Sequence, residues 1–589
     1  MAQSRMSTPV SSVRSTSTAE LDRAVGELSD HAAGFARVGA RQRARLVRHC
    51  LPLALEVAAE WSAAGLRVKG LPGDSIEEWL SGPVPLIRHL RLLAASLDDV
   101  ALRGRPPLGV STRQRDDGRL EVNLFPAVGL DRALYRGFTA LVLLQEGVGR
   151  QAAVEAQAAY YQQRDPVGSV ALVLGAGNVT SIGATDVLTK MFNEGSVCLL
   201  KMNPVNEWVG PFLARALEPL ITAGYLRVVY GGAEVGAYLA GHEGIDAVHL
   251  TGSAATHDAM VWGPPGPESD RRRAANDPVL TVPITSELGN VTPVAVVPHH
   301  YSDEQLAFQA RNVATMVANN ASFNCVAAKM IITGTGWAQR EAFLELVADS
   351  LSALPTRNAY YPGAVDRFHA LTEGRAGVRA LGRPAAGQLP WALIPGLDAR
   401  ATDDPLFRVE PFCSLISETS VGGSDPVEFL AAATSFMNDT LWGTLSACIV
   451  IHPELERDPA VAAALDRAVL ELRYGTVAIN HWTAFGYALV SPPWGGHPST
   501  SLQDIQSGLG WVHNTSMLGG VDKVVVRGDL LTRPDPAWFA GRVGLGRVGP
   551  RLAALEAAPS WAKLPGLLLG TMLPARPGHG EPEPAKEAG

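Results

Sequence analysis

The sequence predicts an α/β protein whose central part is a doubly wound, Rossmann-like and largely parallel sheet. Two observations lead to this fold class. From Pro166 onward, short apolar runs alternate with helix-like segments, and several of these runs end in glycine. Short apolar runs of this kind are typical of strands that are buried on both faces. Their alternation with helices is typical of βαβ units, which build parallel sheets.

Length and composition limit the domain count and the partners. The chain has 589 residues, of which 47% are hydrophobic and 18% are charged. Single cores stop growing near roughly 250–300 residues, so at least two domains are expected. The formal net charge of −8 does not suit a protein that binds duplex nucleic acid, which requires a basic face. The five cysteines lie far apart, which favours reduced thiols and a cytoplasmic location over a disulfide framework.

The chain begins with a predicted disordered leader at residues 1–17, which are rich in Ser and Thr and have no apolar signal region. Ser17 and Glu20 have the spacing of a capping box, so helices are expected from residue 18 to about 104. The Asp117–Gly118 pair, followed by an alternating run, predicts a β-hairpin.

The first α/β block covers residues 166–253. Strands are expected at residues 167–177, 196–204, 225–232 and 245–253, with helices at 180–195, 211–224 and 233–244. Residues 261–280 are rich in Pro, Gly and charge, and they are predicted to form a surface loop. The Arg271–Arg273 run in this loop is expected to be solvated, with contact to a phosphate as the alternative.

A second α/β block covers residues 288–490. Strands are expected at residues 293–298, 328–334 and 446–453, with helices at 304–319 and 339–351. Residues 576–589 have the composition of a disordered tail. No apolar stretch reaches the ~18 residues that span a bilayer. Residues 564–575 are apolar but short, and we expect a packed or docking segment there, with a membrane anchor as the alternative.

Three separated residues suggest covalent chemistry. Cys325 follows a polar segment of small residues; a reactive thiol needs partial access and a local field that lowers its pKa, whereas a lone cysteine is more often a small buried hydrophobe. Glu287 precedes a glycine and can act as a general base. Asn178 ends an apolar run, where its amide can donate a hydrogen bond to an oxyanion.

Other strand ends suggest a nucleotide site. Gly175 and Gly177 fit G-x-G, but Thr180 stands at the third position, so the usual dinucleotide fingerprint fails. Lys201 ends the next apolar run, where a cation can bind ribose or phosphate. The remaining candidates are Gly252 and Ser253 in HLTGS, Glu410 and Phe412 in VEPF, Asn480 in AIN, and Gly495 and Gly496 in SPPWGG.

These elements, in this order, resemble the aldehyde dehydrogenase superfamily over residues 166–496, and the helical region before them is also similar. The resemblance implies that Cys325 is the nucleophile, Glu287 the general base and Asn178 an oxyanion donor. It also implies that NAD or NADP is bound by a second group of residues: Gly175, Gly177, Lys201, Gly252, Ser253, Glu410 and Phe412. No metal ligand is expected.

The motifs depart from the family pattern at several positions. Asn290 replaces the second glycine of E-L-G-G, and Ala176-Gly177 replaces Pro-Trp before the asparagine. Pro204 replaces the acid that typically binds the adenosine ribose, which leaves the choice between NAD and NADP open. Cys413 follows Phe412 where glycine is usual. The 261–280 segment and the part after about residue 520 exceed the common family length.

The resemblance implies a domain order and an assembly. N-terminal helices and a nicotinamide-nucleotide-binding domain would occupy residues 18–287, a catalytic domain 288–490, and a C-terminal return with an oligomerisation element 491–575. Family members are usually dimers or tetramers built through an added sheet strand. A homodimer or homotetramer is therefore expected, and the β-branched residues 522–528 are the candidate strand.

The implied activity is oxidation of an aldehyde to a carboxylic acid through a cysteine thiohemiacetal and a thioester. Two alternatives remain open. The first is a CoA-dependent acyl-CoA or aldehyde reductase, in which the arginines of residues 271–273 would contact a CoA phosphate. The second is a nucleotide-binding or scaffold protein that has lost catalysis, which the motif departures suggest.

Overall fold

A computed structural model describes residues 13–572. Residues 1–12 and 573–589, which hold most of the predicted leader and the predicted tail, lie outside the described residues. The end of the predicted leader is ordered, because Thr16 exchanges two hydrogen bonds with the backbone of Tyr230, each 3.0 Å long. The ordered chain therefore begins before residue 18.

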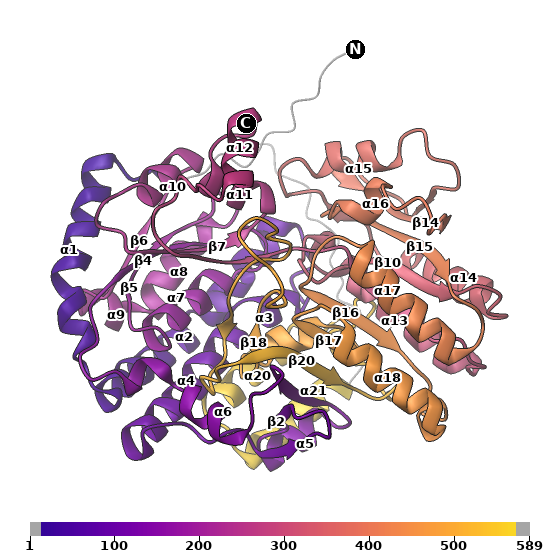
Figure 1. The fold of residues 1–589 in the computed structure, drawn as a ribbon, viewed down its shortest axis with the longest axis horizontal. Helices are drawn as coiled ribbons and strands as arrows, with labels where there is room; N and C mark the ends of the chain where they lie inside the picture. Colours follow the sequence, from indigo (N-terminus) through magenta and orange to yellow (C-terminus); the bar gives the residue numbers. More distant parts are fainter. Residues whose placement is uncertain (1–12, 573–589) are drawn as a thin grey trace, which may run out of the picture.

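The N-terminal region is helical, as predicted. It contains α1 (Thr18–Ala36), α2 (Ala40–Lys69), α3 (Glu77–Ser81) and α4 (Pro83–Arg103). The predicted capping box opens α1, because the Glu20 carboxylate accepts a hydrogen bond of 2.8 Å from the backbone N–H of Ser17. The helix α2 ends at Gly70, whose φ of 65° lies in the left-handed region that glycine adopts without steric cost. Of these helices, α1 packs against strands of the smaller of the two main sheets (Figure 1), whereas α2 and α4 pack against each other and against helices of that sheet's layer.

The smaller sheet is parallel and doubly wound, as predicted. Its strand order is β6–β5–β4–β7–β8. The strands are β4 (Val170–Leu174), β5 (Val197–Lys201), β6 (Leu226–Val229), β7 (Ala247–Gly252) and β8 (Ile284–Leu288). The helices between them are α7 (Ile182–Phe192), α8 (Gly210–Ala216), α9 (Glu218–Thr222) and α10 (Ala233–Ala240). β5 and β7 flank β4 on opposite sides, so the chain leaves β4 in one direction and leaves β7 in the other. The loops that follow these two strands therefore diverge and open a crevice at the carboxyl ends of the strands.

The surface loop predicted at residues 261–280 is largely helical instead. The helix α11 (Ala254–Trp262) extends into this segment, and α12 (Pro267–Ala275) follows. Proline suits the first helical position, and the acidic first turn and basic last turn of α12 complement the helix dipole. The Gly- and Pro-rich composition therefore reflects the short turn between α11 and α12 rather than a long loop.

The larger sheet has eleven strands in the order β1–β2–β3–β20–β17–β16–β9–β10–β15–β14–β12. In chain order these are β1 (Ser111–Gln114), β2 (Leu120–Phe125), β3 (Thr139–Leu144), β9 (Thr292–Val296), β10 (Ala328–Gly334), β12 (Arg379–Leu381), β14 (Trp391–Leu397), β15 (Leu415–Val421), β16 (Ser446–Val450), β17 (Thr476–Ile479) and β20 (Val521–Arg527). The predicted hairpin is formed by β1 and β2, with Gly118 in its turn. The sheet therefore joins the hairpin region to the second α/β block.

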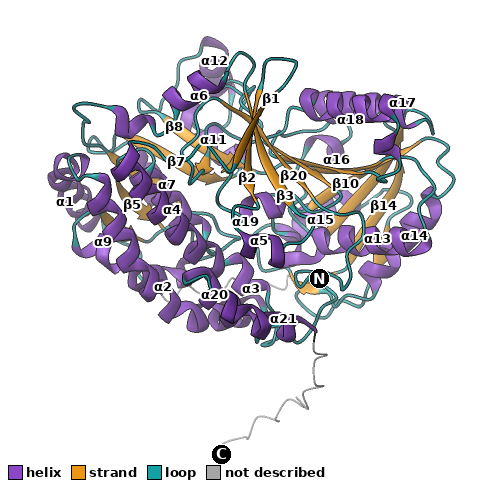
Figure 2. Ribbon diagram, turned by 90° about the horizontal axis from the view of Figure 1, so that it is seen from below, coloured by secondary structure: helices purple, strands orange, loops and turns teal. Residues whose placement is uncertain are grey.

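Helices cover both faces of the central part of this sheet (Figure 2). The helices α13 (Asp303–Ala318) and α14 (Arg340–Ser352) pack on one face, and α17 (Pro426–Asp439) and α18 (Pro459–Glu471) pack on the other. The strands β9, β10, β15, β16 and β17 run parallel between these layers. Burial on both faces explains the nearly continuous apolar runs in these strands.

The strand predicted to mediate oligomerisation has no free edge. β20 pairs in parallel with β17 and antiparallel with β3 of the same chain. Val524 lies opposite Thr476 on one side and Val142 on the other, and its side chain is fully buried. The apolar, β-branched composition of residues 522–528 thus reflects an internal strand. A homodimer or homotetramer remains a prediction, but β20 cannot supply a free edge for it.

The chain continues past β20 into residues 528–572, which we call the C-terminal segment. It contains α20 (Val548–Ala557) and α21 (Leu564–Met572), and α20 packs against α2 and α4. Leu564 and Leu567 are buried whereas Leu568 and Leu569 are exposed, so α21 packs through one side. Within residues 13–572, no helix has the length and apolar character needed to cross a membrane.

The substitution Val524→Asp should unfold the protein. A carboxylate at this position would be buried without a partner between two strands, and we expect a loss of more than about 4 kcal/mol in the free energy of unfolding. Chemical denaturation together with light scattering checks this. A variant that stays folded but changes from an oligomer to a monomer would contradict the internal position of β20.

Candidate active site

The ten predicted site residues all line one cavity of about 1060 Å³ between the two main sheets. Asn178 follows β4, Glu287 lies in β8 and Cys325 lies in the loop before β10. Gly175 and Gly177 follow β4, Lys201 ends β5, and Gly252 and Ser253 lie where β7 meets α11. Glu410 and Phe412 precede β15. The structure therefore brings these ten residues together, whereas the further candidates Asn480, Gly495 and Gly496 do not line the cavity.

A left-handed turn presents Cys325 to this cavity. Asn320, Ala321 and Ser322 have φ values of 52°, 55° and 70°, a region that residues other than glycine rarely occupy. Three such residues in a row store strain that the surroundings must compensate, which is common at functional sites. The Asn320 amide donates to the backbone carbonyl groups of Asn178 and Phe323 at 3.2 and 3.1 Å. These bonds tie the turn to the end of β4.

Lys329 holds the same turn from the other side. Its ammonium donates to the Ser322 carbonyl at 3.1 Å, to the Ser322 hydroxyl at 2.6 Å and to the Cys413 carbonyl at 3.0 Å. Burial lowers the pKa of Lys329 to about 8. Lys329 lies within an apolar run, and no motif in the sequence distinguishes it as a site residue.

The Cys325 thiol is protonated in this state. Cys325 is partly accessible, whereas the other four cysteines are buried. Burial raises the pKa of the Cys325 thiol well above its usual value, and the negative charges of Glu287 and Glu410 raise it further. The expected field that lowers this pKa is therefore absent. A nucleophilic thiolate requires that a neighbouring base accept the thiol proton as the reaction begins.

Glu287 is placed to be that base. It is buried, and burial raises its pKa to about 8, with a further contribution from the negative charge of Asp186. Interactions with Cys325 and Trp494 act in the opposite direction. The Glu287 Oε1 atom has no hydrogen-bond partner among the described residues. A carboxylate with a pKa near neutral and an unpaired oxygen is suited to proton transfer.

Asp186 and Trp494 are site residues that the sequence analysis missed. Asp186 lies within α7, where it accepts a hydrogen bond of 2.8 Å from the Thr251 hydroxyl, and it raises the pKa of Glu287 through space. Trp494 is fully buried and lies in the SPPWGG motif, beside the two glycines that had been noted. Its place between a proline and two glycines was the sequence feature from which Trp494 could have been selected as a site residue. Asp186 had no such signal, because its effect depends on the packing of α7 against β7.

Asn178 is oriented by bonds on both its backbone and its side chain. Its carbonyl accepts hydrogen bonds from Lys69 Nζ at 3.1 Å and from the Asn320 amide. Its own side-chain amide donates to the Phe323 carbonyl at 3.0 Å. That amide carries two N–H groups, so the second can donate to a substrate oxygen. Lys69 was not predicted from the sequence, and its buried pairing with Glu78 at 2.7 Å holds it in place.

The opposite part of the cavity has the features of a nucleotide cradle. Small residues of α10 and its flanks line it, namely Ala233, Gly236, Ala237, Ala240 and Gly241. The Lys201 ammonium stands at the end of β5, and burial lowers its pKa, while Glu234 and Glu207 oppose this effect. Open α/β sheets bind ligands at such carboxyl strand ends. The volume, the small-residue wall and the single lysine fit a dinucleotide.

Glu410 lies between the cradle and Cys325. Burial raises the pKa of Glu410 to about 8, while Lys329 is the strongest of the groups that lower it. Its carboxylate packs so closely on Gly289 that a Cβ atom at residue 289 would collide with it. Glycine at this position therefore allows the Glu410 side chain to occupy the cavity. One of its oxygens, Oε1, has no hydrogen-bond partner among the described residues and can accept one from a bound hydroxyl.

Two departures from the family motifs have structural explanations. Asn290 is fully buried and does not line the cavity; its amide donates to the Ser446 carbonyl at 2.8 Å and its oxygen accepts from Thr292 at 2.9 Å. It therefore fastens β9 to β16. Cys413 is also fully buried and offers only its carbonyl, which accepts the bond from Lys329. Neither change removes a group from the cavity.

The arginines of α12 are paired with acids. Arg271 and Arg272 bind Glu268 at 2.8 and 3.0 Å, and Arg273 pairs with Asp258. All three remain at the surface, as the solvated-patch interpretation predicts. Their charges are thus compensated within α11 and α12.

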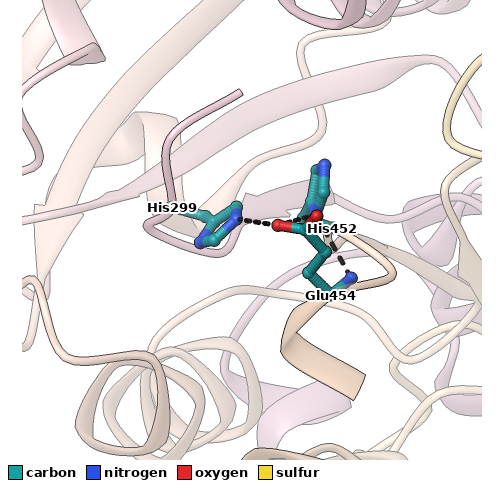
Figure 3. A group of neighbouring side chains, drawn as sticks. All are labelled: His299, His452 and Glu454. Carbon is teal, nitrogen blue, oxygen red and sulfur yellow. Dashed lines mark hydrogen bonds and ion pairs between the residues drawn. The ribbon is translucent and has the colours of Figure 1, made fainter. Parts of the chain in front are cut away.

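A group of three side chains with metal-binding potential lies elsewhere in the described part of the chain (Figure 3). His299 follows β9 and His452 follows β16, so both lie at the carboxyl ends of parallel strands. Glu454 Oε2 stands 3.6 Å from His299 Nε2 and 3.8 Å from His452 Nδ1. The loop with Cys325 precedes β10, so it lies at the amino ends of these parallel strands, on the opposite side of the sheet from the carboxyl ends. This group therefore takes no part in the chemistry at Cys325.

Fold and site together place a cavity of dinucleotide size beside the smaller sheet and a partly accessible cysteine before a strand of the larger sheet. Comparison with known proteins agrees with this arrangement: the model of the aldehyde dehydrogenase family matches residues 138–364. The match lies in the part of the chain that supplies Asn178, Lys201, Glu287 and Cys325.

Solved structures extend the likeness to most of the chain. An aldehyde dehydrogenase of Mycobacterium tuberculosis, complexed with NAD+, is 18% identical, with a TM-score of 0.58 over 89% of this chain and 92% of that one. The NADP-complexed glyceraldehyde-3-phosphate dehydrogenases of Bacillus halodurans and Methanocaldococcus jannaschii are 18% and 14% identical, with TM-scores of 0.56 and 0.59. They match over 88% of this chain and over 92% and 96% of theirs.

These findings agree with the predicted resemblance: residues 138–364 match the aldehyde dehydrogenase family model, and the solved structures share the fold over most of the chain. They also confirm the predicted fold class, since the whole-chain matches share its two α/β layers. The low identity agrees with the number of altered motif positions.

Proposed function

We propose that the protein oxidises an aldehyde to a carboxylic acid with NAD or NADP, through a covalent thioester on Cys325. The convergence of Cys325, Glu287 and Asn178 at one end of a nucleotide-sized cavity is the observation that carries this proposal. A thiol, a carboxylate near its pKa and a free amide N–H are the groups that acyl chemistry on a cysteine needs.

In the first step, Cys325 Sγ forms a bond to the carbonyl carbon of the aldehyde. The thiol proton passes to the carboxylate of Glu287, which lies beside it. The carbonyl oxygen becomes negative and accepts hydrogen bonds from the Asn178 amide and from the backbone N–H of Cys325. Removal of one such donor typically lowers the rate by about 10²–10³-fold.

The nicotinamide, when bound, supplies the acceptor for the hydride that leaves the carbon, and the bound substrate becomes a thioester. The chain's own residues hold the dinucleotide in position. Lys201 lies where ribose or phosphate oxygens would be bound, and Ser253 begins α11, the helix whose N-terminus faces the cavity. Glu410 would accept a hydrogen bond from the ribose beside the nicotinamide, with Phe412 next to it.

In the last step, Glu287 takes a proton from water, and the water oxygen bonds to the thioester carbon. The bond between carbon and Sγ then breaks, the carboxylic acid leaves, and the thiol is restored. Glu287 thus serves twice as a base. Between these steps the carboxyl group loses the thiol proton to solvent, and at the end it returns the proton taken from water to Sγ. A pKa of about 8 lies close enough to neutral pH for the group both to accept and to release a proton.

Both cofactors fit the adenosine end of the cavity. Pro204 lines it where an acid would bind the ribose and repel a 2′-phosphate. Among the described lining residues, the acids are Glu287 and Glu410, which both lie near Cys325. Lys201 offers a positive charge to a phosphate. We therefore infer that NADP is accepted at least as well as NAD.

The alternatives receive less support from this geometry. The three arginines considered for a CoA phosphate are paired with acids in α11 and α12. A protein that had lost catalysis would have no constraint to keep Glu287 buried beside a strained cysteine turn. Hydrolytic release is favoured, because Glu287 has an unpaired oxygen in the cavity.

The substitution Cys325→Ala should abolish aldehyde oxidation, with a loss of roughly 10⁴-fold or more, because no other nucleophile lines the same position. Dinucleotide binding should persist. Reduced-cofactor absorbance, with NAD+ and NADP+ in parallel, measures the first effect, and calorimetric titration measures the second. Cys50→Ala, in α2 and remote from the cavity, is the matched control and should retain full activity. Normal turnover by Cys325→Ala would sink the proposal.

The pH dependence should report Glu287. Only the ionised carboxylate can accept a proton, so kcat/KM should fall as pH decreases through about 8, the pKa to which burial raises this group. Initial rates between about pH 6 and 10 measure this profile. In Glu287→Gln this ionisation should disappear and the remaining rate should be low. A profile that is unchanged in Glu287→Gln would show that another group is the base.

A further inference from the structure

A second cavity, of about 160 Å³, meets the first at Cys325. Cys325 is the residue that lines both. We call the second cavity the substrate chamber. Its walls come from α3 and α4, from the loop before β3, from α19 (Ala484–Ala488) with its flanks, and from the C-terminal segment. An aldehyde bonded to Cys325, with the dinucleotide in the larger cavity, would have its remaining atoms in this chamber.

Seven Phe, Tyr and Trp side chains line the chamber. Phe138 lies 4.5 Å from Phe485 and 5.7 Å from Trp538, measured between ring centroids. Closer to Glu287, the rings of Tyr487 and Trp494 are 5.7 Å apart and nearly perpendicular. Tyr135 and Trp482 complete the aromatic set. Such rings give a planar apolar guest both stacked and edge-to-face contacts.

The chamber offers no uncompensated charge. Glu77 is paired with Arg357 at 2.7 Å, and Arg88 is paired with Glu556 at 2.9 Å. Burial lowers the pKa of His481 to about 4, so this ring is neutral near pH 7. A substrate with a carboxylate or a phosphate would lose its hydration without gaining a partner, which is costly. The chamber therefore selects against charged aldehydes.

The C-terminal segment supplies the chamber wall that limits its size. Trp538 lies in the segment before α20, and Leu552 and Glu556 project from α20. The Arg88–Glu556 pair, reinforced by Arg91 at 2.6 Å, fixes α20 against α4. The resulting volume of about 160 Å³ is close to the ~150 Å³ of an apolar cavity that holds one benzene molecule. One ring fits within this volume, whereas a long alkyl chain would extend beyond it.

We propose that the substrates are compact, uncharged aldehydes with a single aromatic ring, and that the C-terminal segment sets this limit. The inference rests on the proposed function, since it assigns a substrate class to the same thiol. The phosphorylated aldehyde in the names of two structural neighbours has no counterpart in this chamber, because Arg88, the arginine among the described lining residues, is already paired with Glu556.

The first test compares kcat/KM for benzaldehyde, decanal and succinic semialdehyde in the full-length protein. We expect benzaldehyde to exceed each of the other two by at least about tenfold, because one misplaced methylene alone changes such ratios by about 10–200-fold. A higher value for decanal or for succinic semialdehyde would overturn the substrate class while leaving the proposed function intact. If none of the three is oxidised and Cys325→Ala binds no dinucleotide, the proposed function itself fails.

The second test enlarges the chamber. Trp538→Ala and Leu552→Ala should each raise kcat/KM for decanal relative to benzaldehyde by at least about fivefold, since each removes volume from the wall. Trp561→Ala is the matched control, because this tryptophan lies in the same C-terminal segment, is 61% exposed and does not line the chamber. An unchanged ratio in both chamber variants would overturn the role of the segment.

A binding measurement distinguishes the effect of the chamber's shape on substrate affinity from effects on the chemical step or on folding. Calorimetric titration of benzaldehyde into Cys325→Ala should show binding that Trp538→Ala, introduced in the same background, weakens by about tenfold or more. Thermal unfolding identifies any variant that fails to fold, in which case Leu552→Ala, the smaller change, replaces it. Benzaldehyde binding that is equal in Cys325→Ala with and without the chamber substitution would contradict the proposal.

Discussion

The hydrogen bond between the Asn320 amide and the Asn178 carbonyl joins the two sheets at the point where the chemistry is proposed. Asn320 opens the left-handed turn before Cys325, and Asn178 follows β4 of the smaller sheet. This link helps to hold the strained turn and Asn178 in place. Lys69 and Lys329 support the link from the two sides. The site thus depends on a polar network between sheets rather than on either sheet alone.

Burial adjusts the acid–base behaviour of that network. Glu287 and Glu410 both lie in the cavity near Cys325, and burial raises the pKa of each to about 8. The same low-dielectric surroundings keep the Cys325 thiol protonated until a base accepts its proton. A site of this kind stores little net charge before substrate binds, which suits the uncharged chamber on the other side of the thiol. Charge then develops only where Asn178 can stabilise it.

Much of the fold and the site could be predicted from the sequence. The strands that end at Leu174, Lys201 and Gly252 could be predicted from their apolar runs and from the residues that bound these runs. The runs are apolar because the strands are buried on both faces. The motif order located Cys325 and Glu287. Asp186, Lys69 and Lys329 could not be found in this way, because each acts through space from within an ordinary helix or strand. The role of residues 522–528 was misjudged because an internal strand and an interface strand have the same composition.

The most direct measurement of the central claim is mass spectrometry of a trapped intermediate. Every turnover passes through the thioester, so acid quenching of the unaltered protein within the first turnover after rapid mixing with aldehyde and NADP+ should leave the acyl group on protein. The account predicts a thioester on the peptide that contains Cys325, and none when Cys325 is replaced by alanine. An acyl group on any other cysteine, or reduced cofactor without an adduct, would contradict it.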